Sequence, residues 1–305
     1  MKLPTGLRGV LPVLQTPFDD DESIDFETLE KEIDWLFEIG ADGVVMAMAS
    51  EITRLSDTER REMAAAVCHY GRGRGSVVIS VGAESSRIAE QLAIHAQTAG
   101  ADAVMAIPPL RGGVGEVELA RYYRRIAGAI DLPVIIQDPS GYTGSQPLPV
   151  SLYAALLDEY GDRIYFKPEA TPPGPRLSAI RDQTGGAARL FGGTGGISFV
   201  DCYRRGLIGS MPGSGLADAL VAAWRHLQAN EENRAYRLTL PFSALVALHQ
   251  GIDGFLIVEK IILERRGIFK NTLIRGPMGF TADAETVQEI HRLADIIIEE
   301  MAKEP

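Results

Sequence analysis

The chain has 305 residues, 46% of them hydrophobic, and a formal net charge of −11 at pH 7. This length and composition suffice for one large α/β domain with a substantial core. The acidic balance argues against nucleic acid or an anionic membrane as the main partner. No run approaches the roughly 18 apolar residues that span a bilayer, and residues 1–9 lack the apolar stretch of a secretory signal. We therefore expect a cytoplasmic protein.

Short apolar runs rich in β-branched residues recur through the first two thirds of the chain and alternate with segments of helical periodicity. Most are separated by roughly 25 to 35 residues, the spacing of β/α units. Eight such units predict a closed, parallel (β/α)8 TIM barrel. The predicted strands span residues 10–14, 43–46, 77–81, 103–107, 133–137, 164–167, 190–193 and 209–211.

The helical segments between these runs carry start and stop signals. Leu29, Ile33 and Leu36 share one face of a predicted helix, and Gly40 follows as its C-terminal stop. Ser56 and Glu59 have the spacing of a capping box, which opens the next helix.

After the eighth strand the pattern becomes helical throughout. Apolar residues recur with helical spacing over residues 255–263 and 287–297. Because one helix is enough to complete the barrel, we predict a barrel over residues 1–225 and a C-terminal helical extension over residues 226–305. The extension should pack on the barrel or lie at a subunit interface.

In this fold the catalytic residues lie at the C-terminal ends of the strands and in the loops that follow. Lys167 ends an apolar strand, so its side chain should point into the barrel mouth. Desolvation there favours a neutral amine, which can attack a ketone and form an iminium. Position alone leaves two alternatives open: a catalytic amine, or a structural lysine paired with Glu169 or Asp138.

Metal and cofactor chemistry is not indicated. No histidine, cysteine or carboxylate cluster has the spacing of a metal site. The two cysteines are far apart and are predicted to be small core residues. All the histidines fall in predicted helices and are expected to be packing or surface residues. They are His69, His95, His226, His249 and His291, and the cysteines are Cys68 and Cys202.

Glycines cluster after the last two strands, at residues 192–196 and 209–215. Their backbone N–H groups suit the binding of a phosphate or a carboxylate. Tight turns beside a crowded barrel rim would need the same glycines. The sequence leaves both readings open.

Several segments resemble the dihydrodipicolinate synthase and N-acetylneuraminate lyase family of class I aldolases, over nearly the whole chain. Residues 9–18 resemble its first strand, and residues 43–59 resemble its G-T-T-G-E-x-x-x-L-S-x-x-E segment. Pro108 and Pro109 match its fourth strand end. Residues 164–170, IYFKPEA, resemble the I-x-x-I-K-E-A segment whose lysine forms the Schiff base. The resemblance implies that Lys167 is the catalytic amine, that the substrate is a 2-keto acid, and that the protein is a homotetramer without a cofactor.

Departures from the family pattern concentrate at the barrel mouth. Met48 and Ala49 replace paired threonines, and Leu110 replaces an aromatic residue. Residues 137–139 read Gln-Asp-Pro where the family has Y-N-x-P, and Tyr142 stands where the synthase has a substrate-binding arginine. The absent tyrosine normally relays protons in the synthase. The K-x-E pattern and the Gln-Asp pair resemble instead the family's 2-keto-3-deoxy sugar acid dehydratases.

We therefore predict a Schiff-base lyase acting on a 2-keto-3-deoxy sugar acid, as a dehydratase or an aldolase. Lys167 would form the iminium, Glu169 would remove a C3 proton, and Glu169 or Tyr142 would protonate the departing C4 hydroxyl. The predicted substrate-binding residues, which would hold the carboxylate and orient the hydroxyls, are Ala49, Ser50, Gln137, Gly193 and Met211.

Three alternatives remain. The first is dihydrodipicolinate synthase itself, acting on pyruvate and aspartate semialdehyde. The second is a barrel isomerase that binds a phosphorylated substrate near Gly195 and Gly213, although the usual histidine or glutamate base is missing. The third is a non-catalytic 2-keto acid binding barrel, against which the retention of Lys167 and Glu169 argues.

Overall fold

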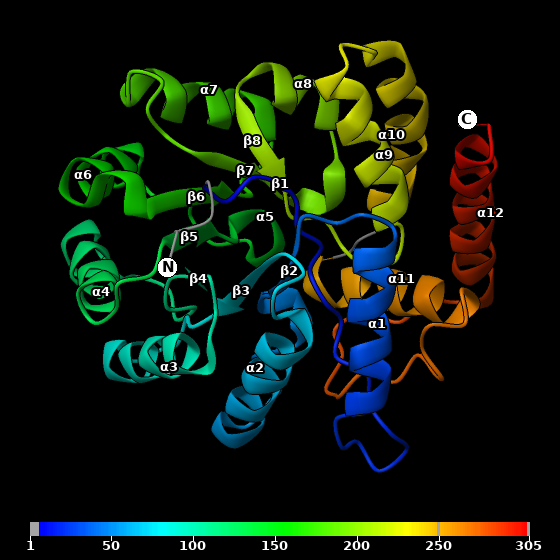
Figure 1. Cartoon of the computed structure of the whole chain (residues 1–305), viewed down its shortest axis with the longest axis horizontal. Coiled ribbons are helices and arrows are strands. Elements are labelled where there is room, and N and C mark those ends of the chain that lie inside the picture. The colour runs from blue at the N-terminus through cyan, green and yellow to red at the C-terminus, as the bar shows by residue number, and fades with distance from the viewer. Residues whose placement is uncertain (1–5, 249–250, 304–305) are drawn as a thin grey trace.

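The computed structural model of the chain describes residues 6–248 and 251–303. Eight parallel strands form one sheet in the order β1-β8-β7-β6-β5-β4-β3-β2. The two edges meet where Val13, just after β1, bridges Val45 in β2. The strands are β1 (Gly9–Val10), β2 (Gly43–Met46), β3 (Ser76–Ser80), β4 (Ala103–Ala106), β5 (Val134–Asp138), β6 (Ile164–Pro168), β7 (Leu190–Gly192) and β8 (Leu207–Ser210). The predicted (β/α)8 barrel is confirmed (Figure 1).

The first strand differs most from its prediction, residues 10–14. Only Gly9 and Val10 pair regularly with β8. Beyond them the chain divides its hydrogen bonds between two neighbours, because it closes the barrel. The N–H of Val13 donates to Pro212 on one side (2.7 Å), and the N–H of Leu14 donates to Val45 on the other (2.9 Å).

Each strand is followed by a helix that packs on the outside of the barrel. These helices are α1 (Phe26–Glu38), α2 (Asp57–Gly71), α3 (Ser86–Ala99), α4 (Glu116–Gly128), α6 (Val150–Tyr160), α7 (Pro173–Gln183), α8 (Phe199–Arg204) and α9 (Ala217–Gln228). Short segments η1 (Met48–Ser50), α5 (Ser140–Thr143), η2 (Gly161–Arg163) and η3 (Thr194–Gly196) lie in the connections.

The predicted helix signals operate as expected. Leu29, Ile33 and Leu36 of α1 are completely buried against the barrel, and Gly40 adopts φ +88° after the last turn. At α2 the Ser56 hydroxyl accepts from the N–H of Glu59 (3.2 Å), and the Glu59 carboxylate accepts from the N–H of Ser56 (2.8 Å). The capping box therefore satisfies two N–H groups that the first turn leaves free.

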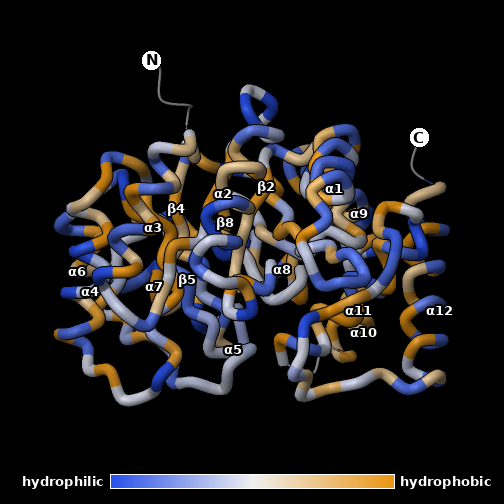
Figure 2. The backbone as a smooth tube through the Cα atoms, turned by 90° about the horizontal axis from the view of Figure 1, so that it is seen from below, coloured by the Kyte–Doolittle hydropathy of each residue, from blue (hydrophilic) through white to orange (hydrophobic). Residues whose placement is uncertain are grey.

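The hydrophobic core has two layers. Figure 2 shows hydrophobic residues in orange, which alternate with hydrophilic residues along the helices. One layer fills the barrel interior and includes Val45, Met105, Ile135, Tyr165 and Phe191. The other joins the outer face of the strands to the surrounding helices. The barrel is thus a packed support, and its free space lies at the ends of the strands.

The C-terminal region consists of helices α10 (Glu232–Val246), α11 (Gly251–Arg265) and α12 (Ala284–Met301). With α8 and α9 they bury a separate cluster that includes Leu220, Phe242, Ile262 and Ile297. Helix α9 runs to Gln228 and so crosses the predicted domain boundary at residue 225. Figure 1 places these helices on one side of the barrel.

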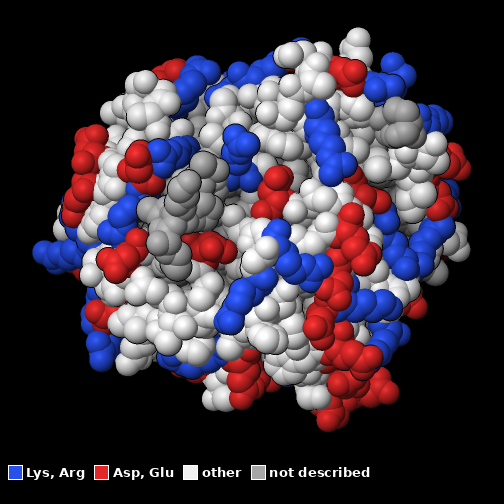
Figure 3. Space-filling view, in the orientation of Figure 1, with Lys and Arg blue, Asp and Glu red and all other residues white. Residues whose placement is uncertain are grey.

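On the face shown in Figure 3, acidic and basic side chains are interspersed and neither sign of charge dominates. Within residues 6–248 and 251–303, none of the helices is both long and apolar enough to cross a bilayer.

Candidate active site

A small cavity lies at the C-terminal end of the barrel. It brings together residues from the C-terminal ends of six strands, or from the segments that follow them, and residues from α11. Its polar groups gather on one wall, and the remaining walls are apolar. The residues that line it are Val13, Ala47, Met48, Ala49, Gln137, Tyr142, Lys167, Glu169, Gly195, Met211, Ile252 and Phe255.

Lys167 occupies the position expected for an amine that meets a substrate. It lies near the end of β6, is 3% exposed, and has Gln137 of β5 as its neighbour in register. Its Nζ is 3.1 Å from Oε1 of Glu169. Of the two carboxylates considered as partners of Lys167, Glu169 is therefore the one that contacts it. Asp138 is engaged elsewhere, since it accepts from the N–H of Leu148 (3.0 Å).

Glu169 is the centre of a small buried network. The Gln137 amide donates to its Oε2 (2.5 Å) and the N–H of Thr194 donates to its Oε1 (3.2 Å). Gly193 makes room for this carboxylate, because a Cβ on that residue would lie 2.3 Å from Oε1. The loop after β7 thus holds one carboxylate oxygen of Glu169, and Gln137 holds the other.

Tyr142 approaches the cavity from α5, the short helix that follows β5. Its ring packs edge-on against Phe255, with the ring centroids 5.9 Å apart. Burial, and then the nearby carboxylates of Glu169 and Glu259, raise the pKa of the Tyr142 phenol well above its usual range. The phenol therefore keeps its proton at neutral pH and can act as a proton donor.

The turn after β2 places Ala47, Met48 and Ala49 along the cavity. Ser50 is completely buried beside them. Its hydroxyl donates to the carbonyl of Leu14 (2.5 Å) and accepts from the N–H of Ala47 (2.9 Å). The Ser50 side chain is therefore occupied in holding the turn.

The structure brings most of the predicted site residues into one cavity: Lys167, Glu169, Tyr142, Gln137, Ala49 and Met211. Ser50 and Gly193 lie one layer behind it, where Ser50 fixes the turn and Gly193 admits Glu169. Sequence reasoning missed Ile252 and Phe255, which line the cavity from α11. Their helix was predicted, but its helical periodicity gave no indication that it reaches the barrel mouth.

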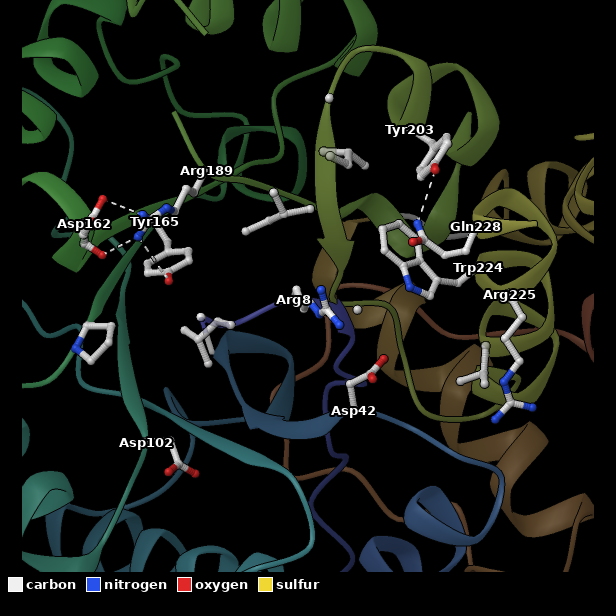
Figure 4. Close-up of a pocket in the computed structure, with 18 of the residues that line it drawn as sticks. Arg8, Asp42, Asp102, Asp162, Tyr165, Arg189, Tyr203, Trp224, Arg225 and Gln228 are labelled. Atoms are coloured by element: carbon white, nitrogen blue, oxygen red, sulfur yellow. Dashed lines mark hydrogen bonds and ion pairs between the residues drawn. The ribbon is translucent and has the colours of Figure 1, made fainter. Parts of the chain in front are cut away.

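A second, wider cavity lies at the opposite end of the barrel, where the strands begin (Figure 4). Its charged groups serve the fold. Asp42 accepts from the N–H of Val10, and Asp102 accepts from the N–H of Val77, both at 2.8 Å. Arg189 pairs with Asp162. Side chains that fix the strand starts in this way are typical of the end of a barrel that supports stability, so we place the chemistry at the other end.

Among the described residues, none of the His, Cys, Asp and Glu side chains form a group of three that could hold a metal ion. His69, His95, His226 and His291 lie in helices, as predicted, and His249 lies outside the described residues. Both cysteines are buried, and burial raises the pKa of Cys68 to about 12 and that of Cys202 to about 11. Such thiols are poor nucleophiles, so the cysteines are core residues.

Comparison with known proteins places this geometry in a family. A family model described as the dihydrodipicolinate synthetase family matches residues 6–158. L-2-keto-3-deoxyarabonate dehydratase of Azospirillum brasilense is 26% identical over 281 residues, which cover 89% of this chain and 88% of the relative. A 4-hydroxy-tetrahydrodipicolinate synthase of Methanococcus vannielii is 32% identical over 177 residues, 58% of this chain and 60% of the relative.

The fold agrees with that assignment. The crystal structure of dihydrodipicolinate synthase from Rhodopseudomonas palustris superposes with a TM-score of 0.86 at 24% identity, covering 95% of this chain and 97% of that one. The family match takes in half of the chain, and the structural likeness extends over nearly all of it. The chain therefore belongs to the dihydrodipicolinate synthetase family of lyases.

Proposed function

We propose that this protein is a Schiff-base-forming dehydratase of a 2-keto-3-deoxy sugar acid. The observation that carries the proposal is the buried line of Lys167, Glu169 and Gln137, with contacts of 3.1 and 2.5 Å. An amine and a carboxylate held together in a nearly dry cavity provide both the nucleophile and the base that such a reaction needs. The similarity to a 2-keto-3-deoxyarabonate dehydratase over 89% of the chain supports the same substrate class.

The first half of the reaction forms a covalent intermediate on Lys167. Glu169 accepts a proton from the Lys167 ammonium across their 3.1 Å contact, and the neutral amine attacks the C2 ketone. Protonated Glu169 returns its proton to the C2 oxygen, which leaves as water, so Glu169 is again a carboxylate and an iminium joins Nζ and C2. The positive nitrogen withdraws electrons and makes the C3 protons acidic.

The second half removes the C4 hydroxyl. Glu169 takes a proton from C3, and the electron pair forms an enamine. That pair then expels the C4 hydroxyl, which leaves as water after receiving a proton from Tyr142 or from protonated Glu169. The Tyr142 phenol lines the same cavity and is protonated at neutral pH, so it has a proton to give. Hydrolysis of the iminium then frees the product and regenerates Lys167.

The wall of the cavity argues for this chemistry over the synthase reaction. At the position of the synthase's tyrosine this chain has Gln137, whose amide donates to Glu169. An amide orients a carboxylate but does not relay a proton as a phenol does. Aldol cleavage of the same substrate class shares the Lys167 intermediate and differs only in whether the C3–C4 or the C4–O bond breaks. The homotetramer implied by the family resemblance remains a prediction, which analytical ultracentrifugation tests.

Borohydride trapping tests the proposal. The protein is incubated with pyruvate, and separately with 2-keto-3-deoxy pentonates and hexonates, then reduced and weighed by mass spectrometry. We expect a mass gain that maps to Lys167 and disappears in Lys167→Ala. Lys270→Ala is the matched control, because that lysine is exposed and lies outside the cavity, where it pairs with Asp25.

Product analysis separates the remaining alternatives. Dehydration leaves the carbon chain intact, whereas aldol cleavage releases pyruvate and an aldehyde. Turnover of pyruvate with aspartate semialdehyde would instead identify a synthase. A folded protein that gives no adduct with any 2-keto acid would refute the Schiff-base mechanism.

A further inference from the structure

Two charged residues lie next to each other within the apolar part of α11. Glu259 is 7% exposed and Lys260 is completely buried, and they are flanked by the buried residues Val258 and Ile262. Burying charges in this way is costly unless each one is paired. Their partners lie on two different loops of the barrel mouth, and the cavity itself is lined from the same helix by Phe255.

Lys260 binds the turn after β2. Its Nζ is 2.6 Å from Oε1 of Glu51, and both side chains are completely buried. The same Nζ donates to the carbonyl of Leu273 (2.6 Å) and lies 4.7 Å from the centre of the Phe18 ring. Lys260 is thus held from several directions, and within residues 6–248 and 251–303 the acidic side chain that forms an ion pair with it is that of Glu51.

Glu51 ends the segment that lines the cavity. It adopts φ +55°, a left-handed conformation that is unfavourable for a residue with a side chain. The preceding residues Ala47, Met48 and Ala49 form one wall of the cavity. We name residues 47–51 the β2 turn. Because the turn departs from regular structure at Glu51, its path depends on the contacts that hold this side chain.

The other contacts of Glu51 are weaker or come from the exposed side. Arg54 Nη1 lies 3.9 Å from its Oε2, and the N–H of Arg275 donates to Oε2 at 3.3 Å. Glu259, the neighbour of Lys260, accepts from the N–H of Gly215 in the loop after β8 (2.7 Å). Two successive residues of α11 therefore bind two loops at the C-terminal end of the barrel, one after β2 and one after β8.

We propose that Lys260 is a positioning residue of the active site, which holds the β2 turn through Glu51 at the distance from Lys167 that the substrate requires. The effect of Lys260 on the reaction rests on the proposed function, whereas its effect on the β2 turn rests on the geometry alone. It makes the C-terminal extension a part of the catalytic unit, since a residue of α11 controls a wall of the cavity. A buried ion pair that only added stability would be replaceable by apolar side chains of similar size.

The test compares Lys260→Met, the double variant Glu51→Gln/Lys260→Met, and the surface control Lys270→Met in the full-length protein. Three quantities are measured: the melting temperature, amide hydrogen exchange over residues 47–51, and the pyruvate concentration that gives half-maximal borohydride-trapped adduct. The double variant removes both charges, so it restores the stability that an unpaired buried Glu51 would lose.

We expect exchange in the β2 turn to increase in Lys260→Met and in the double variant. We also expect the half-saturating pyruvate concentration to rise by about tenfold to a hundredfold, because small displacements of a binding wall have effects of that size. KM for the sugar acid should rise with it, while kcat changes less. Lys270→Met should match the wild type in exchange over residues 47–51 and in the half-saturating pyruvate concentration.

A double variant that regains the wild-type melting temperature, exchange and half-saturation would overturn the inference and leave the pair a purely structural one. Hydrogen exchange does not depend on turnover, so the two proposals fail separately. Absence of an adduct in the wild type refutes the proposed function, whereas unchanged exchange over residues 47–51 in Lys260→Met and the double variant refutes the role of Lys260.

Discussion

The amide Nε2 of Gln137 lies 2.5 Å from Oε2 of Glu169, so a neutral side chain from β5 orients the carboxylate that also contacts Lys167. A carboxylate with one oxygen held by an amide and the other facing an amine has a defined direction for proton transfer. Gln137 therefore orients the Glu169 carboxylate, and the carboxylate exchanges the proton, so the two roles can be tested with separate variants.

Replacing Glu169 by Gln should slow turnover severely and should also slow adduct formation on Lys167, because Glu169 accepts a proton in both steps. Glutamine fills the same space and still contacts Gln137 and Lys167, but it cannot take the C3 proton. We expect kcat to fall by about a hundredfold to ten-thousandfold, the usual contribution of a general base. Steady-state kinetics measures the loss of turnover, and borohydride trapping measures how much more slowly the adduct on Lys167 forms.

Glu159→Gln is the matched control, since that carboxylate pairs with Arg124 on the surface. If Glu169→Gln kept a rate within a few fold of the control, another group would have to be the base.

Replacing Tyr142 by Phe should slow loss of the C4 hydroxyl. The ring would keep its edge-on contact with Phe255, while the proton donor would be lost. We expect kcat to fall by about a hundredfold with little change in KM, and the adduct with pyruvate to form normally. Tyr70→Phe, on the outer helix α2, serves as the control. An unchanged kcat in Tyr142→Phe would assign both proton transfers to Glu169.

Replacing Gly193 by Ala should displace the carboxylate of Glu169. The new methyl group would lie 2.3 Å from Oε1 and 2.5 Å from Cγ of Glu169, so the carboxylate must move. Since displacements of about 1 Å can cost a hundredfold in rate, we expect a loss of at least tenfold in kcat. Gly128→Ala is the control, because a Cβ there meets nothing within 4 Å. Equal rates for the two variants would show that Glu169 does not depend on this contact.

Replacing Glu32 by Gln should change how stability depends on pH. Burial is the largest cause that raises the pKa of Glu32 to about 8, from 4.5. Below about pH 4.5 the carboxyl is protonated in both the folded and the unfolded state, so it contributes no pH dependence. Between pH 4.5 and 8 only the unfolded state releases the proton, so stability falls by up to about 1.4 kcal/mol per pH unit.

The Glu32→Gln variant lacks this loss and should gain stability relative to the wild type as pH rises from 5 to 8. The N–H of Gln15 still finds an acceptor there. Urea unfolding at pH 5, 6.5 and 8 measures the difference, with the exposed neighbour Glu30→Gln as control. A difference between variant and wild type that stays constant with pH would contradict the prediction.

Local patterns in the sequence were sufficient to predict most of the barrel. The spacing of Leu29, Ile33 and Leu36 and the capping box at Ser56 act over one or two helical turns, so their outcome depends little on the rest of the chain. The location of Lys167 and Glu169 at the barrel mouth was also predicted from the sequence, because residues at the C-terminal end of a strand in such a barrel lie at that mouth.

The contacts between distant segments depended on the tertiary structure. Glu51 and Lys260 are 209 positions apart and meet only because α11 packs across the barrel mouth. Ser50 was predicted to bind substrate, yet its hydroxyl bonds to Leu14, 36 positions away. Helical periodicity says which face of α11 is apolar but not which surface covers it. Glu259 and Lys260 are charged residues inside that apolar segment, and buried charges require polar partners. Only the packing of the whole chain decides which partners these are.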